Sequence, residues 1–416
     1  MRGPALYVLA WRNLWRHRLR TALTLVAIAF GGFFAVIMTA THDRSFADFV
    51  DTAARLGSGH VAIQHPDYAD RPTLAHTVRG TDEKRAVAES DPRVSTAVER
   101  TSGTTMLSTT EDSFGALFIA FDPTAETEQT MRFRDAVVAG EMFPTADAKG
   151  IVLGSTLAKN LGATLGDKIV YTLTDRHGEI VAGMERLSGI LTTHTPSLDV
   201  GLALLPLGTV RQALGYGPEE ATQVAVFLSD SRQTHKVAKR LVPLIPDAAV
   251  LTWDRVMPEI RSFIAMKIGG GRFMAVVVAI LVCAGIFNTL FVSVLERMRE
   301  FGILRALGYS SGQLFRLVMW ESAWLALLGI VAGTILTVPV YLPLAKNGID
   351  LTEVYTSGGQ ALEVAGVGFD MVLRIGIFPE HVLFIALCIV FATLAAGLYP
   401  AWRVGHVEPV ESIKLV

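Results

Sequence analysis

The sequence predicts an α-helical membrane protein with four transmembrane helices and a large α+β domain inserted between the first two. Three observations predict this fold class. Hydrophobic residues make up 51% of the chain and charged residues only 18%, a balance that lies between soluble proteins and chains composed of spans alone. The apolar residues gather in four long runs. The segment between the first two runs instead alternates between helix-like and strand-like patterns.

A membrane-spanning helix needs about 20 predominantly apolar residues. Four ranges meet this condition, and only the third contains a charged residue, Glu321: residues 21–41, 273–295, 317–345 and 382–402. The first range follows several arginines, as the apolar core of a secretory signal peptide would. Because its apolar run is longer than such a core, we interpret it as a retained span.

The distribution of arginine predicts the orientation in the membrane. Residues 1–20 contain arginine and no acidic residue, and residues 296–316 are also rich in arginine. In residues 346–381, by contrast, most of the charged residues are acidic. Positively charged loops tend to stay in the cytoplasm. We therefore expect both chain ends, including the tail at residues 403–416, and the 296–316 loop to be cytoplasmic. Residues 42–267 and the short 346–381 loop are then periplasmic.

The inserted segment is predicted to contain an α/β subdomain built from both of its ends and a β-rich subdomain at about residues 110–215. At each end a helix leads through a proline turn into a strand: helix 82–89 with strand 94–99, and helix 232–244 with strand 249–252. The β-rich part is predicted from strand patterns at residues 114–121, 168–173 and 179–191. A further strand pattern, at residues 221–228, fits either subdomain.

The first 20 residues have the pattern of an amphipathic helix. Apolar and basic side chains follow neighbouring stripes at helical spacing, formed by Val8, Trp11, Trp15 and Leu19 and by Arg12, Arg16 and Arg20. Such a helix can lie along the inner membrane surface before the first span. The alternative, that the arginines act only as a topology signal, stays open.

Three local signals concern the third span. Ser310 and Gln313 have the spacing of a capping box, which predicts a helix from about Ser311. Gly329 and Gly333 form a pair of small residues that would let another helix approach closely. Tryptophans flank Glu321 on both sides, and we expect its carboxylate to lie at headgroup level in contact with water.

The sequence indicates a non-catalytic chain without a cofactor or metal. No nucleotide-binding P-loop, G-x-S-x-G or H-E-x-x-H motif occurs. The net charge of −2 gives no reason to expect nucleic acid. Both cysteines, Cys283 and Cys388, fall in apolar runs, so no disulfide framework is expected.

Histidine positions give no clear metal or catalytic signal. The four histidines near the start of the inserted segment match no zinc pattern, and we expect surface or turn histidines there: His42, His60, His65 and His76. His194 and Asp199 flank a proline turn and could form part of a polar site, but isolated polar residues beside a turn are the simpler interpretation.

The most informative segment connects the second and third spans. Residues 295–321 place arginine and glutamate among apolar side chains and contain Gly308, where the chain can turn. Apolar anchors for a groove, together with charges that set the register, are the chemistry of a docking element. An ordinary cytoplasmic turn has a similar composition, and the residues alone leave the two interpretations open.

This segment resembles the signature of the FtsX-like permeases, in the superfamily of ABC transporters that contains MacB and the lipoprotein-releasing LolC and LolE proteins. The similarity lies in "ERMREFGILRALG", residues 296–308, followed by Glu321 at the start of the next helix. Further similar stretches are "AWRNLWRHRLRTALTLVAIAFG" near the start, "VLGSTLAKNLGATLGDKIVYTL" in the inserted segment and "YPAWRVGHVEPVESIK" at residues 399–414. "SGHVAIQHPDY", residues 58–68, resembles the lipoprotein-releasing branch.

The resemblance implies that two permeases pair, as a homodimer or a related heterodimer, and that each docks a separate cytoplasmic ABC ATPase. ATP is then bound by the ATPase and not by this chain. The residues implied to couple the ATPase are Glu296, Arg297, Arg299, Glu300, Phe301, Gly302, Ile303, Leu304, Arg305 and Gly308. Phe301, Ile303 and Leu304 would enter a groove of the ATPase, and the arginines with Glu300 would form salt links. The inner-surface helix would contribute Trp11, Arg12, Trp15 and Arg16.

The family's mechanism, called mechanotransmission, passes the closing movement of the ATPases through the spans to the periplasmic domains. Three hypotheses for the output stay open. The first is extraction of lipoproteins or other lipidated cargo from the bacterial inner membrane toward a periplasmic carrier. The second is export of a small molecule or peptide through a periplasmic adaptor. The third is signalling to a periplasmic partner without transport.

Overall fold

The computed structural model describes residues 6–405 except 17, 135, 194, 351–362, 365–366 and 369–371. His194, parts of the predicted 346–381 loop and residues 406–416 of the predicted tail lie outside the described residues. The chain forms two compact units. The helical unit comprises residues 1–45, 266–349 and 373–416, and the mixed unit comprises residues 46–265 and 350–372.

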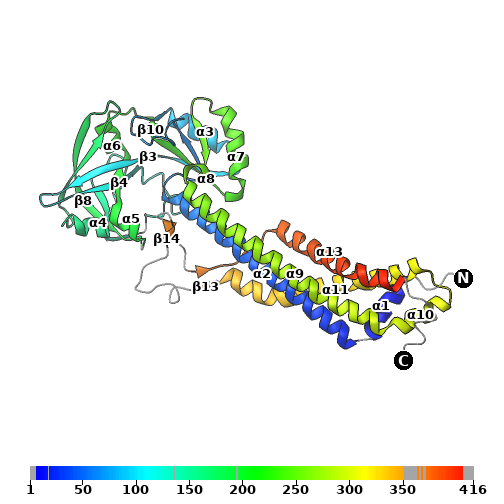
Figure 1. Ribbon diagram of the computed structural model, residues 1–416. Coiled ribbons are helices and arrows are strands. Elements are labelled where there is room, and N and C mark those ends of the chain that lie inside the picture. Colours follow the sequence, from blue (N-terminus) through cyan, green and yellow to red (C-terminus); the bar gives the residue numbers. More distant parts are fainter. Residues whose placement is uncertain are drawn as a thin grey trace. The chain divides into compact units, whose positions relative to one another are not determined.

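Six helices contribute to the described part of the helical unit, and four of them are long and apolar enough to cross a membrane: α2, α9, α11 and α13. The helices are α1 (Leu6–Arg16), α2 (Arg18–Leu56), α9 (Pro258–Glu296), α10 (Met298–Ala306), α11 (Ser311–Lys346) and α13 (Pro379–Gly405). In Figure 1 the four long helices run side by side. Each contributes at least one side chain to a single buried cluster that also contains Leu14 of α1. The other members are Ile28, Ile286, Leu290, Leu325 and Ala396.

Close packing in this bundle depends on small residues of α11. A methyl group added at Gly329 would lie 2.4 Å from a side-chain carbon of Ile28, so any larger residue would push α2 away. Gly333 faces the backbone of Ala29 one turn further along. The structure thus places α2 against the two glycines that the sequence singles out. Elsewhere the long helices expose large apolar side chains, such as Phe273 and Phe391, as a lipid-facing surface would.

The mixed unit is built on a ten-stranded sheet with the order β12-β1-β11-β3-β4-β9-β6-β8-β5, and β7 pairs with both β3 and β8. The strands are β1 (Val61–Gln64), β3 (Val94–Ser108), β4 (Ser113–Phe121), β5 (Val137–Gly140), β6 (Ile151–Gly154), β7 (Lys168–Thr174), β8 (Ile180–Leu191), β9 (Leu202–Pro206), β11 (Gln223–Leu228) and β12 (Ala249–Thr252). β2 (Val78–Arg79) and β10 (Glu220–Ala221) form a separate pair.

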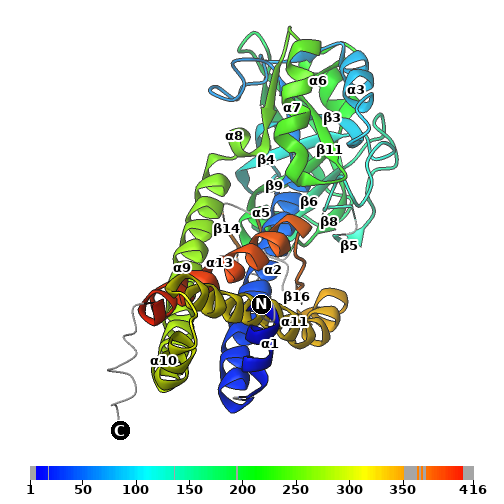
Figure 2. The ribbon, with the colours of Figure 1, turned by 90° about the vertical axis from the view of Figure 1, so that its right-hand side faces the viewer.

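Short helices cover parts of this sheet (Figure 2). They are α3 (Thr81–Glu89), α4 (Ser155–Asn160), α5 (Pro196–Gly201), α6 (Leu207–Leu214), α7 (Thr234–Leu241) and α8 (Trp253–Val256). Beyond these, two short strand pairs are described, β13 (Ile349–Asp350) with β16 (Val372–Leu373) and β14 (Glu363–Val364) with β15 (Val367–Gly368).

Two hydrophobic cores lie on different parts of this sheet. In one core, α3 and α7 pack on β1, β3 and β11. In the other, α4 and α6 pack against strands β3, β4, β6, β7, β8 and β9. The expectation of a strand ending at Glu99 is wrong, because β3 continues to Ser108 and contributes to both cores. The two parts therefore share one continuous sheet.

A buried ion pair fixes the end of α2 to the mixed unit's sheet. Arg100, on β3, is fully buried and donates to the Glu126 carboxylate at 2.8 and 3.0 Å. The same guanidinium donates to the carbonyl of Gly57 at 2.6 Å, immediately after the last residue of α2, and to the carbonyl of Thr130 at 2.8 Å. The pair is well hydrogen-bonded, as a buried charge must be to be tolerated.

We predict that Arg100→Ala destabilises the mixed unit by about 3–5 kcal/mol, because it leaves the Glu126 carboxylate buried without its partner. Hydrogen exchange at the β3 amides of the detergent-solubilised chain measures this as a lower free energy of opening. Arg186→Ala, at an exposed arginine of the same unit, is the control and should stay within about 0.5 kcal/mol. Arg100→Met combined with Glu126→Leu should recover part of the loss. Equal exchange in Arg100→Ala and the control would contradict the prediction.

Candidate functional site

The candidate site is the short hairpin formed by α10 and the start of α11. The helical path breaks at Arg297, which separates α9 from α10. α10 ends at Ala306, and Gly308, two residues later, has a φ of +97°, a backbone conformation that favours glycine. The Ser310 hydroxyl then caps α11, and the Gln313 side chain accepts from the Ser310 amide, so the predicted capping box is confirmed. The hairpin is therefore defined by local chemistry at both of its turns.

The inner side of α10 is fixed by an apolar cluster in which four further helices take part. Phe301 is completely buried there, together with Ala10, Val294, Leu314, Leu317, Val318, Ala401 and Val404. Met298 and Leu304 pack against the same cluster. The expectation that Phe301 itself enters a groove of a partner is wrong for this structure, because helical periodicity turns residues 298, 301 and 304 toward the bundle.

A buried ion pair joins α10 to α11. Arg297 donates to both carboxylate oxygens of Glu321, at 3.0 and 3.1 Å, and to Glu300 at 3.1 Å. The Asn13 side chain donates to Glu321 at 2.7 Å. The Arg297 guanidinium also lies 5.1 Å from the centre of the Phe301 ring. Both members of the pair are less than one tenth exposed, so the electrostatic attraction between them is poorly screened.

This arrangement corrects two expectations. Glu321 does not sit in water between its flanking tryptophans, because the carboxylate turns inward to Arg297. Arg297 in turn forms its salt links within this chain. Burial alone would lower the pKa of Arg297, but the charges of Glu321 and Glu300 raise the pKa above its usual value. Arg297 therefore stays charged.

Other predicted coupling residues lie at the surface of the same cluster. Arg16 lies 3.5 Å from Glu300, and Arg20 pairs with Glu296, so both acidic residues contact the N-terminal helices. Arg305 donates to the Ser311 hydroxyl. These groups are partly exposed, and each contact contributes little on its own. Gly302 is buried, whereas Arg299 and Gly308 are exposed.

The outward side of α10 presents apolar groups. Ile303 is 49% exposed and Leu307 is 73% exposed, and they lie one helical turn apart. Leu304 is only half-buried and turns toward the cluster. The sequence-based set omitted Leu307. Its spacing of four residues from Ile303 is the signal that could have included it.

The predicted inner-surface helix packs on α11. Trp11 meets Trp324 with ring centres 5.0 Å apart, and the indole N–H of Trp324 donates to the carbonyl of Tyr7. Trp15 is half-exposed, and Arg12 and Arg16 are exposed. α1 ends at Arg16 and α2 begins at Arg18, so the boundary between these helices comes earlier than the expected boundary at residue 20.

The site contains no set of side chains arranged for proton transfer or nucleophilic attack among the described residues. What it offers is a small helix fastened to the bundle on its inner side, with an apolar outer side. Such an arrangement can receive a partner and pass its movement to α9 and α11. Together with the four long apolar helices, this is the class of a membrane permease.

Comparison with known families agrees. The model of the MacB-like periplasmic core domain matches residues 21–244, and that of the FtsX-like permease C-terminal region matches residues 272–409. The chain belongs to the FtsX-like permeases with a MacB-like periplasmic core domain, and is an ABC transporter permease of the MacB and LolC family. It is accordingly an inner-membrane protein with a periplasmic domain.

Named relatives point to more than one activity. The chain is 25% identical to the lipoprotein-releasing system transmembrane protein LolC of two strains of Xylella fastidiosa. The match covers 64% of both chains for strain 9a5c, and 79% of this chain and 80% of LolC for strain Temecula1. It is 23% identical to the pyoverdine export ATP-binding/permease protein PvdT of Pseudomonas fluorescens, over 97% of this chain and 58% of PvdT. The matched region is thus less than two thirds of the length of some relatives.

Among solved structures, the periplasmic region of MacB from Actinobacillus actinomycetemcomitans is similar to 51% of this chain and 98% of its own length, with a TM-score of 0.35 and 14% identity.

We predict that Arg297→Ala loosens α10 from the bundle. The substitution leaves the buried Glu321 carboxylate without its partner, which costs about 3–5 kcal/mol of stability. Hydrogen exchange of the α10 amides in the detergent-solubilised chain should accelerate by about 100-fold or more. Arg299→Ala, two residues away and exposed, should leave the exchange unchanged. Matching exchange rates in the two variants would show that the ion pair does not hold α10.

Proposed function

We propose that this chain is the permease subunit of an ABC transporter that works by mechanotransmission, with ATP hydrolysis supplied by a separate ATPase subunit that docks on α10. The observation that carries the proposal is the attachment of α10. Its inner side is fixed by Phe301 and by the Arg297–Glu321 pair, while Ile303 and Leu307 remain exposed on the other side. A partner that binds Ile303 and Leu307 would displace α10 and α11 as one body.

The two longest helices suit the transmission of such a displacement. α2 and α9 each contain 39 residues, a length of about 58 Å at 1.5 Å per residue, which is about twice the hydrocarbon thickness of a membrane. In both helices, one part belongs to the helical unit and the other to the mixed unit. An unbroken helix resists compression, and it can therefore carry movement along its axis.

The orientation that fits this role puts α1, α10 and both chain ends in the cytoplasm and the mixed unit in the periplasm, with four spans between them. The arginines of the first 20 residues and of the 296–316 loop support it. A second permease, identical or related, completes the transporter in this proposal.

Lipidated cargo is the output that we favour. The LolC proteins of Xylella fastidiosa are named as parts of lipoprotein-releasing systems, and the "SGHVAIQHPDY" stretch resembles that branch. In this proposal the permease extracts lipoproteins or other lipidated cargo from the inner membrane. The PvdT match favours a second candidate, export of a small molecule through a periplasmic adaptor. Signalling to a periplasmic partner without transport is the third candidate.

The docking claim predicts that Ile303→Asp combined with Leu307→Asp abolishes binding of the ATPase, because two charges replace the apolar outer side of α10. Co-purification of the ATPase from detergent should fall at least about tenfold, and the permease should no longer stimulate ATP turnover. Val242→Asp, at a similarly exposed apolar residue of the mixed unit (53%), is the matched control. The melting temperature of the permease should not change. Undiminished ATPase capture by the double variant would overturn the claim.

Cargo is tested by purifying the complex in detergent with a hydrolysis-deficient ATPase and identifying the co-eluting molecules by mass spectrometry. Acylated proteins enriched over the Ile303→Asp, Leu307→Asp variant support lipoprotein release. Enrichment of a small molecule alone supports export instead.

A further inference from the structure

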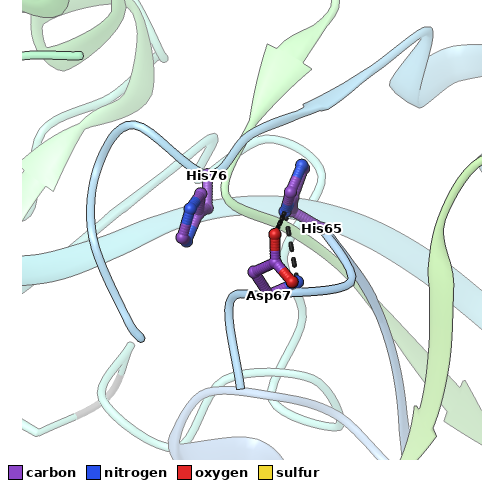
Figure 3. Close-up of side chains that lie close together, drawn as sticks. All are labelled: His65, Asp67 and His76. Carbon is purple, nitrogen blue, oxygen red and sulfur yellow. Dashed lines mark hydrogen bonds and ion pairs between the residues drawn. The ribbon is translucent and has the colours of Figure 1, made fainter. Parts of the chain in front are cut away.

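The loop between β1 and β2 brings together two histidines and an aspartate. His65 directly follows β1, a single residue separates His76 from β2, and Asp67 lies between the two histidines in sequence. Their ligand atoms all lie within 4.8 Å of one another. Figure 3 shows the two imidazole rings beside the Asp67 carboxylate. The sequence predicts only surface or turn histidines here, because the spacing matches no metal motif.

The ring nitrogens are arranged for metal binding. The Nδ1 atom of His76 lies 2.9 Å from the carbonyl oxygen of Arg71. A carbonyl can only accept, so Nδ1 carries the proton and Nε2 keeps a free lone pair. This is the pattern in which a ligating histidine donates its other N–H to a backbone carbonyl. The Nδ1 atom of His65 accepts from the amide of Asp67 at 3.2 Å and lies 3.9 Å from its Oδ2 atom.

The two rings also face each other. Their centres are 4.8 Å apart and their planes differ by only 6°.

The loop is held in place by the mixed unit's core rather than by these three side chains. The buried Tyr68 hydroxyl donates to the carbonyl of Ser102 on β3 at 2.9 Å. Leu74 is buried in the core with β4 and β6, and its carbonyl accepts from the Tyr216 hydroxyl. The Thr77 hydroxyl donates to Glu220. The positions of the three candidate ligands are therefore preorganised.

We propose that His65, Asp67 and His76 bind a divalent transition-metal ion of the zinc class. Two imidazole nitrogens and one carboxylate oxygen suit such an ion, and water would complete its coordination. Ligand–zinc distances of about 2.0–2.2 Å require ligand atoms about 3–4 Å apart. Asp67 is largely exposed (72% for its side chain), so rotation of its side chain can bring a carboxylate oxygen closer to the imidazole nitrogens. The ion would bind the Nδ1 lone pair of His65, which now accepts a hydrogen bond from the backbone amide of Asp67.

The bound ion would cross-link the loop between β1 and β2. It links residues at both ends of the segment that crosses from β1 to β2, and so restricts the chain between them. The consequence for the mixed unit is a metal-dependent rise in stability, because binding to the folded form alone stabilises that form.

The test uses the full chain without an affinity tag, purified in detergent and treated with a chelator. Zn²⁺ titration should show one bound equivalent by elemental analysis and a raised melting temperature, and Co²⁺ should give the visible absorption bands of a nitrogen- and oxygen-ligated site. His65→Ala combined with His76→Ala should lose the bound equivalent and both signals. His177→Ala combined with His235→Ala, which removes two histidines elsewhere in the mixed unit, should keep them.

Asp67→Asn keeps the result interpretable if the double histidine variant folds poorly, since Asp67 is exposed and its replacement should not alter the fold. This variant should bind Zn²⁺ at least about tenfold more weakly and shift the Co²⁺ bands. Zn²⁺ stoichiometry and affinity that are equal in the native chain, in Asp67→Asn and in the double histidine variant would overturn the proposal.

Discussion

Among the contacts that attach α10 to the bundle, the buried pair of Arg297 and Glu321 is the one that fixes its position. Burying two charges is costly, and a pair of this kind gives little net stability compared with apolar residues of the same size. Its value lies in what happens when the partners separate: each would be left charged and poorly solvated. The guanidinium and the carboxylate thus hold α10 at one position against α11, with Asn13 and Glu300 satisfying further hydrogen bonds. An apolar contact alone would allow sliding.

The same physical device recurs in the mixed unit. Arg100 and Glu126 are buried to the same degree as core residues. Arg100 also donates a hydrogen bond to the carbonyl of Gly57, at the end of α2. Near the two ends of α2 there is therefore a charged, geometrically specific joint, at Arg20 with Glu296 and at Gly57 with Arg100. The first is partly exposed and weak, and the second is fully buried. The stronger joint lies in the unit whose movement would be the output.

Much of this architecture could be predicted from the sequence because the signals are local. The long apolar runs, the capping box at Ser310 and the helix, proline turn and strand units each depend on neighbouring residues. Failures arose where residues distant in sequence decide the outcome. The flanking tryptophans of Glu321 predict a carboxylate in contact with water, whereas its partner is Arg297, 24 residues earlier in the chain. The extent of β3 was missed because its second half is stabilised by pairing with β4 and β7.

Phe301 shows how a resemblance can identify a segment and still assign its residues to the wrong side. A motif states which residue types occur in α10, but the face that each occupies follows from the turn at Arg297 and from the apolar side chains that meet there. Once Phe301 is buried, Ile303 and Leu307 must point outward, since positions two and six residues further along lie well away from its face. The packing therefore favours one interpretation of α10 within the proposed function: the aromatic residue anchors the helix to its own chain, and the exposed aliphatic residues beyond it would contact the partner.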